Sequence, residues 1–191
     1  MTRVATVLER IVCACGRLAA WAGVALVLVT MADVVTREFT QSSWGTLRSF
    51  SEWQQNAFGS TKLQELEWHL HTILFLLCLG WAYVKGAHVR IDVLREQFSE
   101  RARSWIEISG ILLFLLPFTG LVVWFGLDFT ASSLAQHESS ASAGGLGHRW
   151  IIKAILPAGL FLLMLAGIAR LLSCIAQLTG SNMGRAADRD R

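Results

Sequence analysis

Charged residues are scarce in this chain of 191 residues. They make up only 16% of it, against 53% hydrophobic residues, and the mean hydropathy is +0.47. Soluble domains carry about 25% charged residues. Four stretches of about 20 residues nearly free of charge would occupy roughly 80 residues as membrane helices. Little of the chain is then left for a soluble domain, so the composition excludes an ordinary soluble domain.

A basic surface and several site motifs are also lacking. Lys and Arg exceed Asp and Glu by only three, 17 against 14, so no basic stripe is available for a nucleic-acid backbone. The chain has no GxxxxGK[ST] loop for phosphate. Its cysteines, Cys13, Cys15, Cys78 and Cys174, lie in or beside apolar stretches, which indicates reduced thiols. Zinc at the first two is disfavoured because no second Cys or His pair has zinc spacing.

Four apolar runs are what the sequence does contain. Because lipid offers the backbone no hydrogen-bond partners, each is predicted to be a transmembrane helix. The predicted spans are residues 11–35, 68–84, 105–127 and 150–169, within one membrane domain of residues 1–180 that precedes a polar cytoplasmic tail, residues 181–191. A cleaved signal peptide is the alternative for the first run, but Trp21 and the length of the run favour a span.

Two local signals fall in the third span. Ser104 and Glu107 form a capping-box pattern, which predicts that the helix starts there. Pro117 lies inside the run and predicts a kink rather than an end, because prolines are tolerated within membrane helices.

The distribution of charge predicts the orientation. Lys and Arg gather before the first span, between the second and third spans, and in the tail, so both termini and the middle loop are predicted to be cytoplasmic. The helix segments at the centre of the bilayer are predicted to carry no charge. Transport sites and proton relays need buried ionisable groups, so the pattern argues against either in this chain. The ionisable residues of the spans all fall near helix ends: Arg17, Asp33, Glu107, Asp128, Lys153 and Arg170.

Histidines offer the main alternative chemistry. His69 and His71 are two residues apart and so point to different faces of a helix. Glu65 and Glu67, four residues earlier, would pair with them at the membrane edge. Haem ligation by His69 and His148, both near the outer face, is the competing interpretation.

The connections differ in character. The first, residues 36–67, carries aromatic residues at helical spacing, which predicts an amphipathic helix in the outer interface, with a small folded cap as the alternative. In the middle loop, His88, Arg90 and Asp92 alternate with apolar residues, as in a tight turn or a docking surface for another membrane subunit. The third connection is rich in Ser and Gly and is either a linker or a docking loop.

Several short strings together resemble one family. They are DVVTR at 33–37, QELEWHL at 64–70, GAHVRIDV at 86–93, ESS at 138–140, GGL at 144–146 and RWIIK at 149–153. On these strings, nearly the whole chain resembles the small permease (Q, DctQ-like) subunit of tripartite ATP-independent periplasmic (TRAP) transporters. The string HVRID after the second span is the most specific of them.

The resemblance implies an all-α, multi-pass subunit of the bacterial inner membrane without enzymatic activity. It would scaffold a large permease (M) subunit, which imports an organic acid with sodium after a periplasmic solute receptor delivers it. No catalytic residue, metal or cofactor is expected in this chain, since sodium coupling would belong to the large subunit. A haem-binding redox anchor and a self-sufficient small transporter are the alternatives. The residues expected to matter for the interface or the fold are Arg37, Glu67, Trp68, His88, Arg90 and Asp92.

Overall fold

Helices make up nearly all of the computed structural model, which describes residues 2–40, 45–87 and 98–189. In chain order they are α1 (Thr2–Thr40), α2 (Gly45–Phe58), α3 (Ser60–Val84), α5 (Glu100–Gly110), the π-helical turn η1 (Ile111–Leu115), α6 (Leu116–Ala135) and α7 (Trp150–Arg189). Within these ranges no strand occurs. The prediction of an all-α fold is confirmed.

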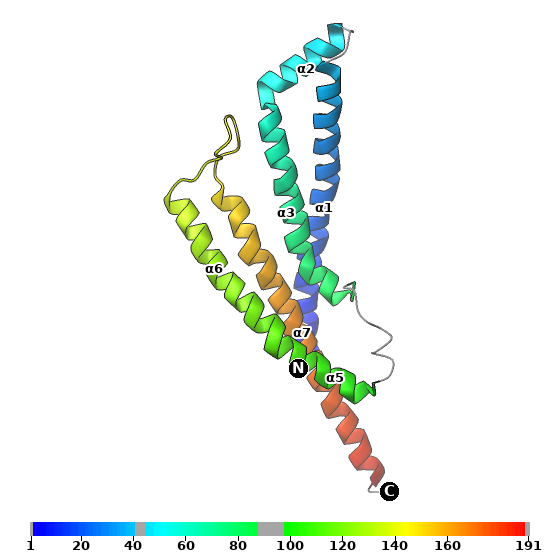
Figure 1. The fold of residues 1–191 in the computed structure, drawn as a ribbon. Helices are drawn as coiled ribbons and strands as arrows, with labels where there is room; N and C mark the ends of the chain where they lie inside the picture. Colours follow the sequence, from blue (N-terminus) through cyan, green and yellow to red (C-terminus); the bar gives the residue numbers. More distant parts are fainter. Residues whose placement is uncertain (1, 41–44, 88–97, 190–191) are drawn as a thin grey trace.

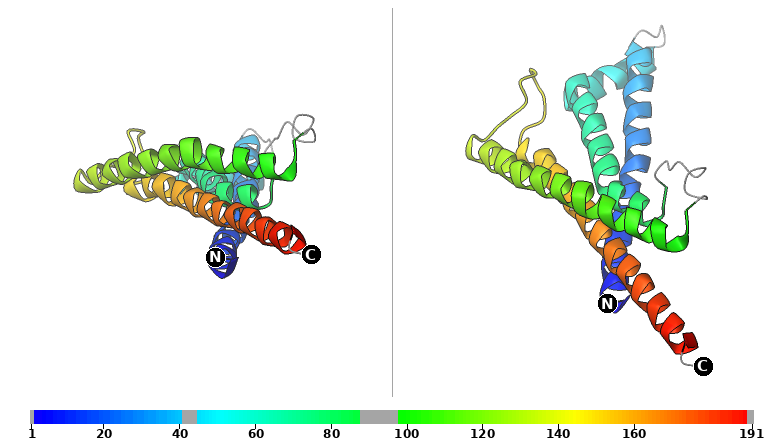
Figure 2. Two further views of the ribbon diagram at one scale, coloured as in Figure 1. Left: turned by 90° about the horizontal axis from the view of Figure 1, so that it is seen from below. Right: turned by 60° about the horizontal axis from the view of Figure 1, so that its bottom comes forward.

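The long helices pack in the order α1, α3, α7, α6. Helix α7 lies in the middle and contacts α1, α3 and α6, whereas α6 reaches the rest of the bundle through α7. Figures 1 and 2 show the pair α1 and α3 and the pair α6 and α7 spreading apart toward one end, where α2 bridges α1 and α3. We call this the α2 end. The opposite end, where α1 begins and α3 finishes, is called the N-terminal end.

Three helices are long and apolar enough to cross a membrane: Arg3–Thr40, Glu100–Ala135 and Trp150–Thr179. They contain three of the four predicted spans and extend past them, because a helix can continue beyond the apolar run that crosses the bilayer. Helix α3 is not among them, since Glu67, His69 and His71 lower the hydropathy at the start of its apolar part. The predicted count of four spans is therefore not confirmed by length and composition.

Small residues let α3 and α7 approach closely. A Cβ atom built at Gly159 of α7 would lie 2.6 Å from the carbonyl oxygen of Leu76. One built at Gly80 of α3 would lie 2.9 Å from the carbonyl oxygen of Leu162. Contacts this short need residues without a side chain, the usual device by which membrane helices bring their backbones together.

The helix of residues 100–135 begins earlier than predicted. Ser99 is its N-cap and accepts a hydrogen bond from the Ala102 backbone at 3.3 Å. The capping box at Ser104 and Glu107 was wrong: Ser104 donates to the Glu100 carbonyl at 3.0 Å, and Glu107 binds a side chain of α7. A cap ahead of Glu100 satisfies the first turn, so no second cap is needed.

Pro117 does not end this helix. It follows the wider turn η1, which gives the proline ring room where an α-helical carbonyl would clash. Thr119 adds a hydrogen bond from its hydroxyl to the Leu115 carbonyl at 2.7 Å. The prediction that the proline is tolerated within the span is confirmed, and the local distortion is a π turn.

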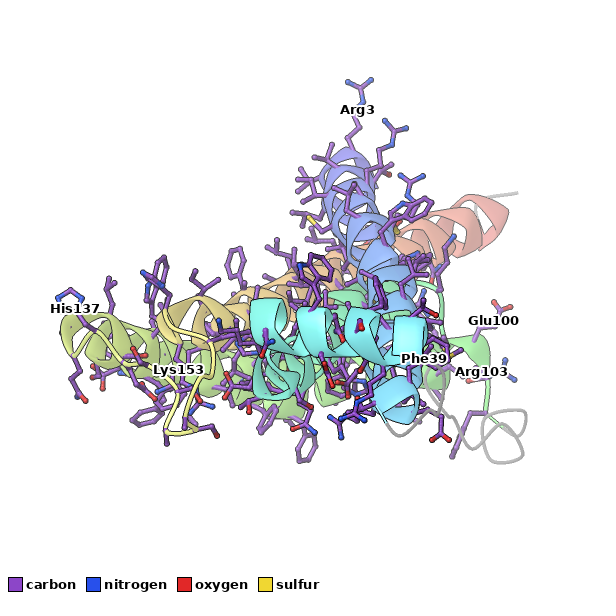
Figure 3. The ribbon with its side chains drawn as sticks, turned by 90° about the horizontal axis from the view of Figure 1, so that it is seen from above. Arg3, Phe39, Glu100, Arg103, His137 and Lys153 are labelled. Carbon is purple, nitrogen blue, oxygen red and sulfur yellow. The ribbon has the colours of Figure 1, made fainter. Side chains whose placement is uncertain are left out.

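The helix predicted in the first connection is present as α2. Phe50 and Trp53 are exposed on it, 54% and 60%, with their rings 6.0 Å apart. Ser51 and Gln54 are buried on the other side. Viewed from the α2 end, α2 covers the end of α1 near Phe39, and His137 lies at the far tip of α6 (Figure 3).

Candidate functional site: polar clusters at the two ends of the bundle

Glu65 organises the α2 end. Its side chain is only 8% exposed. One carboxylate oxygen accepts a hydrogen bond from the Ser140 hydroxyl, and the other accepts one from the Leu146 backbone N–H at 2.5 Å. Arg149 Nη2 lies 3.9 Å from Oε1. We call these four residues the Glu65 cluster; it ties the loop of residues 136–149 to the first turns of α3.

The Glu65 cluster favours the charged form of the carboxyl group. The hydrogen bonds from Ser140 and Leu146 lower the pKa of Glu65 below its ordinary value, and the charge of Arg149 lowers it further, against the opposing effect of burial. Hydrogen bonds to an ionised acceptor are stronger than those between neutral groups. Glu65 is therefore a carboxylate at neutral pH and holds the loop by charge-assisted hydrogen bonds.

The backbone of the loop is shaped around this carboxylate. Ser140 donates its N–H to the Leu146 carbonyl, and Arg149 donates its N–H to the Glu138 carbonyl, both at 3.1 Å. A Cβ atom at Gly145 would lie 2.5 Å from Ser140 Cβ and 2.8 Å from Glu65 Oε1. Any side chain at Gly145 would displace the groups that hold Glu65.

Two cations bind the same loop to α3 and α6. The Arg149 guanidinium lies over the Trp68 ring, 5.7 Å from its centroid. Lys153, in the first turn of α7, forms an ion pair with Glu138 and lies 3.9 Å from the Phe129 ring centroid. That lysine lowers the pKa of Glu138. These contacts join α3, the loop, α6 and α7 at the α2 end.

A second cluster at the α2 end links α1 to α2 and α3. Asp33, 5% exposed, forms an ion pair with Arg37 at 2.6 Å. With the Gln64 carboxamide turned so that its oxygen faces Arg37, that oxygen accepts from Nη1 at 3.2 Å. The fully buried Ser51 of α2 donates to the Thr36 carbonyl at 2.6 Å. The end of α1 is thus held by both of its neighbours.

At the N-terminal end, one ion pair joins α5 to α7. Arg170 Nε and Nη2 donate to the two oxygens of Glu107 at 2.7 and 2.8 Å. This paired geometry fits the planar guanidinium to a carboxylate and fixes the orientation of both groups.

The six residues expected from the sequence do not form a single site. Arg37 lies on α1 with Asp33, while Glu67 and Trp68 lie on α3. Glu67 Oε1 is buried and has no hydrogen-bond partner in the part of the chain that the structure describes. Trp68, 40% exposed, contacts His69 and Arg149. The three middle-loop residues, His88, Arg90 and Asp92, lie outside the described residues.

The histidines of α3 take part in local contacts. The His69 ring lies 4.0 Å from the Trp68 ring, centroid to centroid, and its Nδ1 contacts the Glu65 carbonyl oxygen. His148, with a φ of 57°, is exposed just before α7. Among residues 2–40, 45–87 and 98–189, no three His, Cys, Asp or Glu side chains gather as a metal site.

The contact of Glu65 with the loop does not follow from the sequence pattern. The pattern predicted that Glu65 pairs with His69 and that the loop is a linker or a docking segment. Each residue of the Glu65 cluster lies in a string that carried the family resemblance. These strings were the signal in the sequence that could have pointed to the cluster. Glu65 and Leu146 are 81 residues apart in the chain, so their contact follows only from the packing of α3 against α7.

The model of a known family matches most of the chain. A family model described as "Tripartite ATP-independent periplasmic transporters, DctQ component" matches residues 26–177. The matched range begins within α1 and ends within α7, so it covers both ends of the bundle. In the same comparisons, no curated protein and no solved structure matches the chain.

Proposed function

Because the chain belongs to the DctQ component family of tripartite ATP-independent periplasmic transporters, we propose that it is the small subunit that braces a large permease subunit. The family consists of transporter components rather than enzymes. The apolar helices make the chain a multi-pass membrane protein. We place it in the bacterial inner membrane, in a system that imports an organic acid with sodium after a periplasmic receptor delivers it.

The position of the ion pairs is the observation that carries this proposal. Asp33 with Arg37, Glu65 with Arg149, and Glu138 with Lys153 all lie at the α2 end. Glu107 with Arg170 lies toward the N-terminal end. Charges placed this way hold helix ends together, whereas a solute pathway needs ionisable groups at mid-bilayer depth.

The exterior of the bundle supports a bracing role. Large apolar side chains of α1 and of the helix of residues 100–135 face outward, with Leu18 and Trp21 at 73% and 70% exposure, and Phe114 and Trp124 both at 74%. Such surfaces are stable only against lipid or another apolar helix. A large permease subunit would cover part of this exterior, and lipid would cover the rest.

We propose four crossings, with both termini in the cytoplasm. Helix α1 finishes at the α2 end and α5 begins at the N-terminal end, while α3 runs between the two ends beside α1 (Figure 1). A helix of 25 residues is about 37 Å long, enough to cross the hydrocarbon core. The Lys and Arg distribution supports an orientation with the N-terminal end inside.

Arg37, Glu67, Trp68, His88, Arg90 and Asp92 remain our candidates for interface or fold-critical positions. The ion pair of Arg37 and the contact of Trp68 with Arg149 favour a role in the fold for these two residues. For the three middle-loop residues the support is the family string alone. We place sodium binding in the large subunit and assign no cofactor to this chain.

Co-purification with the large permease subunit tests the proposal. We expect Arg90→Ala and Asp92→Ala to lower the yield of the complex, because the middle loop would contact the partner. Arg48→Ala serves as the control, since Arg48 is 63% exposed and forms its ion pair with its neighbour Glu52 on α2. Unchanged complex yield and unchanged uptake in the two middle-loop variants would remove the claim.

A further inference from the structure

A pocket of about 180 Å³ opens at the N-terminal end, between α1, the end of α3 and α7. This volume is many times the roughly 15 Å³ that a single water needs. Three of the residues that line it carry charged side chains, from three different helices or their ends. The lining residues are Glu9, Tyr83, Val84, Lys85, Gly86, Ala166 and Arg170.

Two of these charges have no ionic partner in the described part of the chain. Arg170 is neutralised by Glu107, which accepts two of its N–H groups. Glu9 and Lys85 form no ion pair with any described residue, nor with each other. The pocket therefore contains the carboxylate of Glu9 and the ammonium group of Lys85, and neither charge is balanced by an ion pair with a described residue.

The pocket lies beside exposed apolar surface of α1. On α1, the residues on either side of Glu9 in the helix include Val7 and Ile11, which are 53% and 45% exposed. A second cavity of about 400 Å³, lined by Ala5, Thr6, Glu9, Ser173, Ala176 and Gln177, flanks Glu9 between α1 and α7. Charged groups beside an exposed apolar helix surface mark the headgroup level of a bilayer.

We propose that this pocket binds the headgroup of an aminophospholipid, phosphatidylethanolamine. Lys85 takes the phosphate and Glu9 takes the primary ammonium, so a single zwitterion compensates both charges. Each contact is a charge-assisted hydrogen bond. Phosphatidylglycerol lacks the ammonium, and the quaternary ammonium of phosphatidylcholine has no N–H to donate. The bound lipid joins the start of α1 to the end of α3, and this inference does not depend on the proposed function.

Native mass spectrometry of the delipidated full chain in detergent tests the assignment. We expect one phosphatidylethanolamine to be retained roughly tenfold more tightly than phosphatidylcholine or phosphatidylglycerol, the factor for about one charge-assisted contact. Equal retention of the three lipids would overturn the proposal. Free phosphoethanolamine that competes as well as the lipid would show a soluble ligand instead, and would overturn the lipid source.

Matched variants separate the pocket from general lipid adhesion. Glu9→Gln and Lys85→Gln should each lose the preference for phosphatidylethanolamine, while Lys62→Gln, an exposed lysine at the other end of α3, should keep it. Lys85→Arg retains the positive charge and should also keep the preference for phosphatidylethanolamine. Retention in this variant would show that the loss in Lys85→Gln comes from the missing charge and not from a folding defect. Full retention of the preference in Glu9→Gln and Lys85→Gln would place the lipid elsewhere.

Discussion

At the scale of single residues, Glu65 is the side chain on which most of the α2 end depends. It accepts hydrogen bonds from Ser140 and Leu146, which lie in a loop with little regular structure. A loop without its own secondary structure has few other means of fixing its backbone. The Glu65 carboxylate supplies the loop with hydrogen-bond acceptors, a role that backbone carbonyl groups have in a helix or a sheet.

Replacing Glu65 should free the loop. In Glu65→Gln, the charge is lost and one acceptor oxygen becomes a donor, so we expect several-fold faster hydrogen exchange across residues 139–147, with the helices unaffected. Hydrogen–deuterium exchange in detergent measures this directly. Glu52→Gln is the control, because Glu52 lies on the exposed face of α2 with Arg48. Equal exchange in Glu65→Gln and the native chain would contradict the role given to Glu65.

The lowered pKa of Glu65 adds a pH signature to this prediction. Because the folded state lowers this pKa, the carboxylate contributes its full stabilisation above the ordinary value of 4.5 and loses it as the pH falls through the folded value. Loop protection should therefore fall in acid below pH about 4. Glu65→Gln should lack this acid-dependent step, since it has no proton to gain there.

Gly145 should be the least replaceable residue of the loop. In Gly145→Ala, the new methyl group would collide with Ser140 and Glu65, so we expect a loss of about 1–3 kcal/mol from overpacking. Gly147→Ala is the matched control, since among the described residues the atom nearest its Cβ position is Ser139 Oγ at 4.0 Å. Thermal unfolding in detergent compares them; similar melting temperatures for the two variants would show that the loop is not packed as described.

At the scale of the helices, close backbone contact between α3 and α7 holds the middle of the bundle. Gly80 and Gly159 provide it from opposite sides. Membrane helices gain little from the hydrophobic effect against each other, so packing of this kind has to supply much of the association. The centre of the molecule is therefore held by shape, and its ends by charge.

Substitution at this contact should loosen the two helices. We expect Gly159→Ala to destabilise the bundle by about 1–3 kcal/mol, because its Cβ would lie 2.6 Å from a backbone oxygen that cannot rotate away. Gly120→Ala on α6 is the control, since no atom of the chain's described part lies within 4 Å of its Cβ position. Unfolding in detergent by heat or denaturant provides the comparison. Equal destabilisation of the two variants would argue against the α3–α7 contact.

The helices could be predicted from sequence, but their ends and polar contacts could not. Apolar runs predicted α1, α7 and the helix of residues 100–135, because run length and burial in lipid follow directly from composition. The start at Glu100 was missed because Ser99 and Ser104 are both acceptable caps, and only the structure distinguishes them. The Glu65 cluster was missed because its members are 75 to 81 residues apart where they hydrogen-bond.

At the scale of the whole molecule, the bundle has polar ends and an apolar waist. The four long helices spread toward the α2 end, and the loop of residues 136–149 and α2 occupy that end (Figure 1). An elongated bundle of this shape offers long side faces to lipid or to a neighbouring subunit. The apolar side faces and the polar ends both follow from the distribution of charged residues along the chain.

The proposed orientation predicts the outcome of reporter fusions. A fusion at residue 97 should report cytoplasm, and one at residue 142 should report periplasm, because α5, η1 and α6 together form a helix long and apolar enough to cross the bilayer between them. Paired alkaline phosphatase and fluorescent protein reporters measure the two sides. The reverse pattern would overturn the orientation, and the same side for both would overturn the crossing.

Transport by reconstituted components tests the central claim, that this chain braces a partner and does not carry solute by itself. Proteoliposomes would contain this chain alone, the large permease subunit alone, or both, with the loaded receptor and a sodium gradient supplied outside. We predict uptake of the receptor-bound acid only when both subunits are present. Uptake by this chain alone, or full uptake by the large subunit without it, would contradict the account.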